Sequence, residues 1–134
     1  MSLEIIQRDR EGVTLLDLNG RLTVGQEAST FRDRVHKLTE SGPRNVILNL
    51  KDVDYVDSTG LGALVMSYTA MVKAGGKIKL LNLTRRSIEL LVMTKLTTIF
   101  EVFDDEQNAI NSFFPGREIK RFDILNFVQQ MKED

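Results

Sequence analysis

Two kinds of apolar segment alternate along this chain, and the alternation restricts the available folds more than any other feature. Short apolar runs, typical of buried strands, occur at residues 3–7, 13–18, 46–50, 77–81 and 99–103. Segments with apolar residues every three or four positions, typical of amphipathic helices, occur at residues 24–38, 61–72, 85–94 and 104–113. Strands that alternate with helices through short connections predict right-handed crossovers. We therefore predict an α/β domain with a mostly parallel sheet, packed helices and an antiparallel first strand at the edge.

Length and composition limit the classes of protein further. A chain of 134 residues has room for one hydrophobic core, which by surface scaling buries about 68% of the unfolded surface. The net charge of −1 and the absence of Trp disfavour a nucleic-acid-binding surface. The chain has no cysteine and no apolar run long enough to span a membrane, so we expect a cytoplasmic protein.

The last twenty residues form a separate segment. Pro115 and Gly116 break the preceding helix, and then Ile124, Phe127, Val128 and Met131 repeat at helical spacing. We predict a domain at residues 1–114 and an amphipathic helical extension at residues 115–134. A helix this short forms only when its apolar stripe is buried, against its own domain, a second subunit in a homodimer, or a partner.

Loops that follow parallel strands gather at one rim of the sheet, and ligands bind there in open α/β folds. Residues 20–25, 52–58 and 82–86 should therefore lie close together. We expect a functional site at this rim. Arg85 and Arg86 there could clamp a phosphate or simply begin a solvated helix.

The turn at residues 57–62 reads Asp-Ser-Thr-Gly-Leu-Gly and joins a strand to a helix. In one interpretation it is structural: Ser58 stands at the N-cap position, Asp57 or Ser58 satisfies the first amides of the helix, and Gly60 and Gly62 allow close packing on the sheet. In the other it is a switch, because a phosphate on Ser58 would meet helix-terminal N–H groups and carry about −1.5 to −2 charges onto the rim.

The same six residues resemble the hallmark of the STAS domains of bacterial anti-sigma factor antagonists. The likeness extends over residues 3–114. It implies a STAS-like fold and a partner-switching role without catalysis or cofactor. In such a protein the serine matching Ser58 is phosphorylated by an anti-sigma factor kinase that binds ATP, and a phosphatase resets it. Binding of the unphosphorylated protein to that kinase frees a sigma factor.

The resemblance also implies a docking surface, formed by Asp57, Thr59, Gly60, Leu61 and Thr23. Thr23 stands where many antagonists have aspartate. STAS domains also occur in stressosome scaffolds, lipid-transport complexes and transporter tails, and the Asp-Ser pair favours the switching branch.

An enzyme remains an alternative interpretation. Asp52 and Asp54 follow an apolar strand in the pattern of haloacid-dehalogenase-like phosphatases, in which the first Asp attacks phosphorus and the second is acid and base. Asp104 and Asp105 could then bind Mg²⁺. The chain is short for that fold, and its single histidine, His36, supports neither a histidine metal cluster nor a Ser-His arrangement. We therefore predict a binding protein with no metal site.

Overall fold

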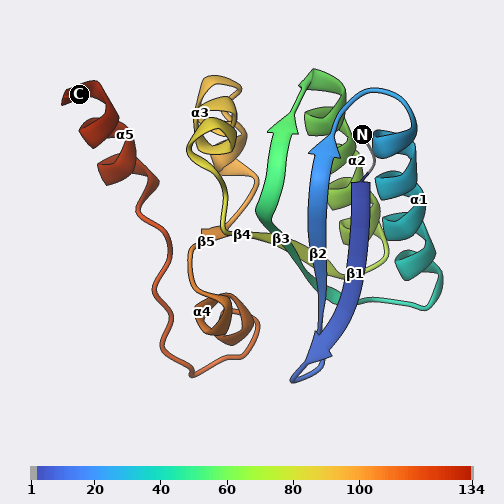
Figure 1. The fold of residues 1–134 in the computed structure, drawn as a ribbon. Helices are drawn as coiled ribbons and strands as arrows, with labels where there is room; N and C mark the ends of the chain where they lie inside the picture. The colour runs from blue at the N-terminus through green and yellow to red at the C-terminus, as the bar shows by residue number, and fades with distance from the viewer. Residues whose placement is uncertain (1–2, 134) are drawn as a thin grey trace.

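A computed structural model describes residues 3–133 of the chain, and the side chains of residues 3–130. The elements, in chain order, are β1 (Leu3–Arg10), β2 (Val13–Leu22), α1 (Gln26–Glu40), β3 (Asn45–Val56), α2 (Ser58–Lys73), β4 (Lys77–Leu81), α3 (Arg85–Met93), a 3₁₀ turn (Leu96–Thr98), β5 (Val102–Phe103), α4 (Glu106–Asn111) and α5 (Ile124–Glu133). Figure 1 shows their arrangement.

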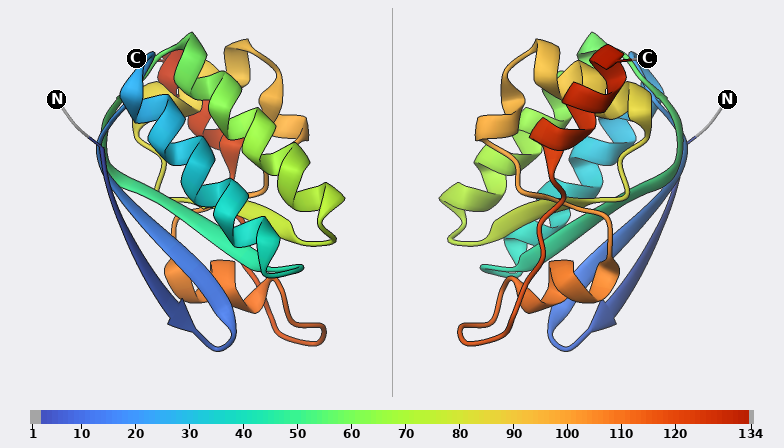
Figure 2. Two further views of the ribbon diagram at one scale, coloured as in Figure 1. Left: turned by 90° about the vertical axis from the view of Figure 1, so that its right-hand side faces the viewer. Right: turned by 90° about the vertical axis from the view of Figure 1, so that its left-hand side faces the viewer.

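The strands form one sheet in the order β1-β2-β3-β4-β5, with β1 antiparallel to β2 and all other neighbours parallel. This confirms the predicted α/β class and the antiparallel edge strand. Helices α1, α2 and α3 cover one face, and α4 covers part of the other (Figures 1 and 2). The main core lies between the sheet and helices α1, α2 and α3. A smaller core, which includes Phe103 and Ile110, lies between the sheet and α4.

The third strand is longer than the sequence predicted. We expected a loop after Leu50, but β3 continues to Val56 because the end of β2 pairs with it, Gly20 with Val53 and Leu22 with Val56. Two register shifts in this pairing accommodate the extension. Asp52 and Asp54 are therefore exposed strand residues.

Other boundaries also differ from the pattern. Val24 fits the apolar stripe of the first helix, yet α1 begins only at Gln26 and the side chain of Val24 is 66% exposed. Val72 fits the stripe of α2 but is 49% exposed. The predicted strand at 99–103 is reduced to Val102 and Phe103, because the 3₁₀ turn occupies the residues before it.

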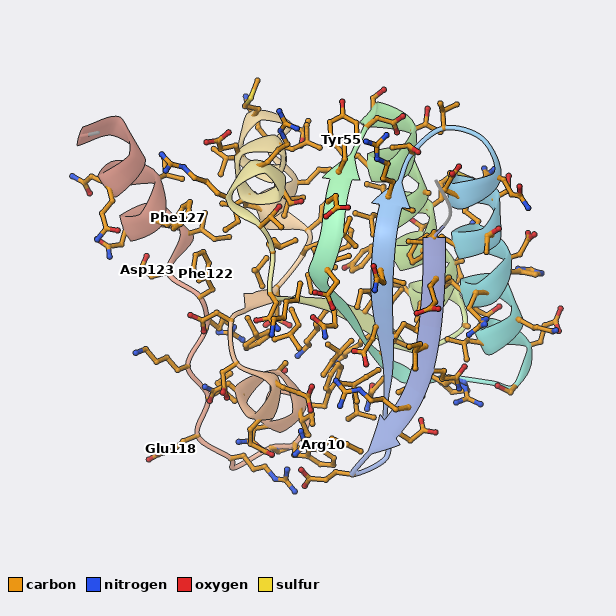
Figure 3. The ribbon with its side chains drawn as sticks, in the orientation of Figure 1. Arg10, Tyr55, Glu118, Phe122, Asp123 and Phe127 are labelled. Carbon is orange, nitrogen blue, oxygen red and sulfur yellow. The ribbon has the colours of Figure 1, made fainter. Side chains whose placement is uncertain are left out.

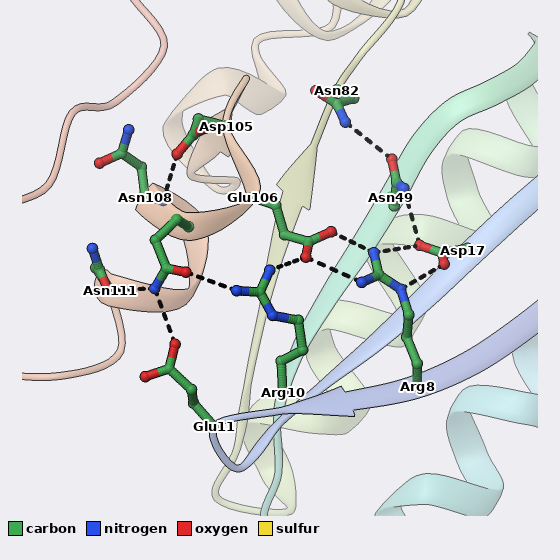
Figure 4. A network of polar contacts seen from close by, with 11 residues as sticks. Arg8, Arg10, Glu11, Asp17, Asn49, Asn82, Asp105, Glu106, Asn108 and Asn111 are labelled. Atoms are coloured by element: carbon green, nitrogen blue, oxygen red, sulfur yellow. Dashed lines mark hydrogen bonds and ion pairs between the residues drawn. The ribbon is translucent and has the colours of Figure 1, made fainter.

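A charged network ties the β1-β2 hairpin to α4 (Figure 4). Arg8 donates from Nε to Asp17 Oδ2 at 2.7 Å and from Nη1 to Glu106 Oε2 at 3.0 Å. Arg10 also pairs with Glu106 and donates to Gln107 at 2.7 Å. Hydrogen bonds from Arg8 and then Arg10 hold the pKa of the Glu106 carboxyl below its usual value, against partial desolvation that raises it. Ionised Glu106 therefore joins two segments that are nearly 100 positions apart.

We expect Glu106→Gln to lower the free energy of unfolding at pH 7 by on the order of 1 kcal/mol, since the partly buried ion pairs are lost. A carboxyl with a lowered native pKa stabilises the fold above its unfolded pKa, and this contribution disappears as pH falls through the native pKa. Urea unfolding from pH 7 to pH 3 should therefore show the two proteins converging in acid. The exposed Glu118, changed to Gln, is the control and should match wild type. A Glu106→Gln deficit that is equal at every pH would contradict this account.

The C-terminal segment folds back on its own domain along β5, as Figures 2 and 3 show. Phe122 donates its N–H to the carbonyl of Val102 at 3.1 Å, which continues the sheet's hydrogen bonding past its last strand. Arg121 pairs with Glu101 at 2.6 Å. Phe122 and Ile124 are half-buried against the main core, and the rings of Phe122 and Phe127 lie 5.6 Å apart. Val128 is half-buried too, whereas Met131 of the predicted stripe lies outside the described side chains.

Truncation after Phe114 should leave a folded domain that melts earlier. Partial burial of Phe122 and Ile124 is worth about 2 kcal/mol, which corresponds to a fall of roughly 5–10 °C. Calorimetry measures this change. The sequence also allowed a homodimer held through α5. If that dimer exists, truncation should halve the mass of the protein in solution. Identical melting and mass for both proteins would contradict a structural role for the segment.

Candidate functional site

The carboxylate of Asp57 joins two loops of the rim. It follows β3, and its Oδ1 accepts the N–H of Gly60 at 2.8 Å, which caps α2. Its Oδ2 accepts the N–H of Val24, from the loop between β2 and α1, at 2.9 Å. These hydrogen bonds, that of Gly60 first and that of Val24 next, lower the pKa of Asp57, so the group stays ionised. Of the two residues that the sequence offered as the cap, Asp57 is the one that caps α2, and the expected N-cap position of Ser58 is wrong.

Gly60 is required by the close approach of α2 to β2. A Cβ at this position would lie 1.9 Å from the carbonyl oxygen of Leu22, far inside van der Waals contact. The same carbonyl accepts the N–H of Asp57 at 3.3 Å. Gly62, in contrast, has open space where a Cβ would stand, so the prediction that both glycines serve close packing holds for Gly60 alone.

The predicted site residues occupy distinct positions around this turn. Ser58 and Thr59 are exposed in the first turn of α2, and Thr23 is half-buried in the facing loop, where its carbonyl accepts the N–H of Ala28 at 3.1 Å. Gly60 and Leu61 are buried beneath them and hold the turn in position. The hydroxyls of Ser58 and Thr59 therefore face solvent above a rigid base.

A third loop reaches the same rim through a stacking contact. The guanidinium of Arg86, at the start of α3, lies 5.3 Å from the ring centroid of Tyr55, near the end of β3. Figure 3 shows Tyr55 at the carboxyl end of that strand. Arg85 pairs with Glu89 at 3.6 Å, so both arginines have partners within α3 or the rim. The predicted gathering of the three loops is confirmed by these contacts and by the bridge through Asp57.

An exposed stripe without charge continues from Ser58 along α2. It comprises Gly62, Met66, Thr69 and Val72, and Met66 is 57% exposed. Val24 adds a further apolar side chain beside Asp57. The apolar periodicity of the sequence predicted that Val24 and Val72 face the core, so it did not identify them as surface residues. Exposed apolar side chains therefore lie on α2 and in the facing loop, next to the hydroxyl-bearing turn.

The acids considered for phosphatase chemistry lie elsewhere. Asp52 and Asp54 are exposed on β3, and Asp105 caps α4 by accepting the N–H of Asn108 at 2.9 Å. Within residues 3–133, no group of three or more His, Cys, Asp or Glu side chains is placed to hold a metal ion. In the same part of the chain, every helix is too short or too polar to cross a membrane.

Comparison with known proteins agrees with this geometry. The sequence model of the STAS domain family matches residues 4–109 of this chain. The chain belongs to the STAS family. Its relatives include the anti-sigma-B factor antagonist of Bacillus subtilis, 33% identical over 110 residues that cover 82% of this chain and 99% of the relative. The anti-sigma F factor antagonist of Paenibacillus polymyxa is 26% identical, with 82% and 94% covered.

A solved structure shares the fold as well. The Bacillus cell fate determinant SpoIIAA, in its phosphorylated form, superposes with a TM-score of 0.65 at 17% identity, with 82% of this chain and 99% of that chain covered. At this identity the likeness establishes the fold alone.

The two glycines of the turn provide a matched test of the site's construction. We expect Gly60→Ala to destabilise the domain by about 3 kcal/mol, because the new methyl group overlaps a backbone carbonyl. Gly62→Ala should stabilise it by up to about 1 kcal/mol, because alanine favours the helix and meets open space. Urea unfolding of both variants measures the difference. Equal effects of the two substitutions would show that α2 does not approach β2 as described.

Proposed function

We propose that this STAS protein is an anti-sigma factor antagonist that binds an anti-sigma factor kinase when Ser58 is unphosphorylated. The observation that carries the proposal is the exposed Ser58 hydroxyl, presented by a turn held by Asp57 and Gly60 and followed by the uncharged stripe of α2. The family relatives named as antagonists support the same role. Binding to the kinase frees the sigma factor, phosphorylation of Ser58 ends the complex, and a phosphatase restores it.

The position of Asp57 supports one way in which a phosphate at Ser58 would act. The sequence suggested that such a phosphate would bind the helix-terminal N–H groups, but the ionised carboxylate of Asp57 already accepts the Gly60 and Val24 amides. A phosphate on Ser58 stands beside a like charge and stays on the surface. It therefore acts on the partner directly, by adding charge to a contact face, and the domain need not refold.

The docking face extends over α2 and the loop between β2 and α1. Ser58 and Thr59 form its centre, and Thr23 and Val24 form one side. The uncharged stripe that includes Met66 extends the face along α2. The stripe of α2 itself carries no charge, and Arg32, Asp33 and His36 of α1 lie beside it at Met66. A dianion introduced at Ser58 must be desolvated when a partner covers this face. The replacement of the family's aspartate by Thr23 keeps this side of the face neutral.

We infer binding rather than catalysis, and a cytoplasmic place of action beside the kinase. A phosphoaspartyl enzyme needs its nucleophile next to a bound metal, and Asp52 stands on the exposed surface of β3. Membership of stressosome or lipid-transport assemblies is the alternative for a STAS domain. The exposed serine after Asp57 favours the kinase-controlled role.

The test compares two substitutions of the same residue in kinase binding. Ser58→Ala should bind the cognate kinase as wild type does and take no phosphate. Ser58→Asp should bind at least about tenfold more weakly, which corresponds to 1.4 kcal/mol or more. Calorimetric titration measures affinity, and mass spectrometry locates the phosphate.

Ser41→Asp serves as the control, because it adds the same charge at the opposite end of α1 from the rim. It should bind the kinase normally. Equal kinase affinities of Ser58→Ala and Ser58→Asp, with phosphate found on another residue, would overturn the assignment of Ser58.

A further inference from the structure

The two edges of the sheet differ in their protection. At β5 the outer edge is covered, because Phe122 donates its N–H to Val102. At β1, within residues 3–133, the backbone hydrogen bonds go to β2 alone. Strand β1 has eight residues, contains no proline and pairs with β2 without a bulge. A long regular edge strand with unpaired N–H and C=O groups is able to accept another strand.

The side chains of β1 form a self-complementary pattern around its middle. Ile6 is 52% exposed. Glu4 and Arg8 lie two positions before and after it, and therefore on the same face of the strand. An acidic, an apolar and a basic side chain thus follow one another at even spacing.

We propose that β1 pairs antiparallel with β1 of a second copy, with the twofold axis at Ile6, to form a homodimer with a continuous ten-stranded sheet. In this register Ile6 faces Ile6 of the second copy, and each Glu4 faces the other copy's Arg8. A one-residue slip would turn the side chains to the opposite face, so the neighbouring registers place the axis at Ile5 or at Gln7, and each sets the exposed Ile6 against a charged side chain, Glu4 or Arg8. The register centred on Ile6 alone pairs Ile6 with Ile6 and Glu4 with Arg8.

Arg8 is able to join this pairing without leaving its own domain. A guanidinium has five N–H donors, and Asp17 and Glu106 engage four of them in the described structure. The fifth is left for Glu4 of the second copy. The net charge of −1 adds little long-range repulsion between copies. This surface lies on the opposite edge of the sheet from β5 and is independent of the proposed role of Ser58.

Cysteine cross-linking tests the register directly, because the chain has no cysteine of its own. In the full chain, Ile6→Cys places two thiols opposite each other, within the Cα separation of a disulfide. Glu4→Cys is the matched control: its two copies would be about 14 Å apart along the strands, beyond disulfide reach. We expect Ile6→Cys to form covalent dimers at least about tenfold faster under mild oxidation, as seen in intact mass.

Sedimentation of the cysteine-free chain tests the association itself. Wild type should show a concentration-dependent dimer that Ile6→Lys abolishes, because two ammonium groups would meet at the axis. Thr30→Lys, which adds the same charge on the exposed surface of α1, should leave the dimer intact. A wild-type chain that stays monomeric at millimolar concentration, or Glu4→Cys that cross-links as fast as Ile6→Cys, would overturn the proposal.

Discussion

The contact between Gly60 and the carbonyl of Leu22 is the constraint on which the rest of the rim depends. Only a residue without a side chain allows α2 to begin this close to the end of β2. That closeness lets one carboxylate, Asp57, accept hydrogen bonds from both its own helix and the neighbouring loop. The position of Ser58 follows, because it is held between a fixed cap and a buried glycine.

This arrangement separates the parts of the site by task. Asp57 and Gly60 hold the turn in position, whereas Ser58 and its exposed neighbours form the surface at which we propose that a partner binds. Because Asp57 already uses the helix-terminal amide of Gly60, a new negative charge at Ser58 finds no internal partner there. In the proposed switch, phosphorylation changes the charge of the surface, and the free-energy change weakens the complex with the partner more than it destabilises the domain.

The sheet also shows how the chain treats its two edges. The C-terminal segment covers β5 through Phe122 and anchors itself with Arg121. The hairpin at the other side is braced by Glu106, yet its outer backbone stays open. One edge is thus completed by the chain itself. The other edge, β1, is the one at which we propose that a second copy pairs.

The sequence by itself determined the α/β class, the order of elements and the position of the strand-to-helix turn at Asp57, because apolar periodicity and turn residues are local properties. It did not determine the length of β3, since the pairing of Val56 with Leu22 joins distant residues. Only the tertiary structure decided that Asp57, not Ser58, caps α2, because the choice depends on which side chain the neighbouring loop can also reach. The tertiary structure likewise decided that Val24 faces solvent. The apolar pattern of the sequence cannot show that α1 begins only at Gln26, two residues after Val24.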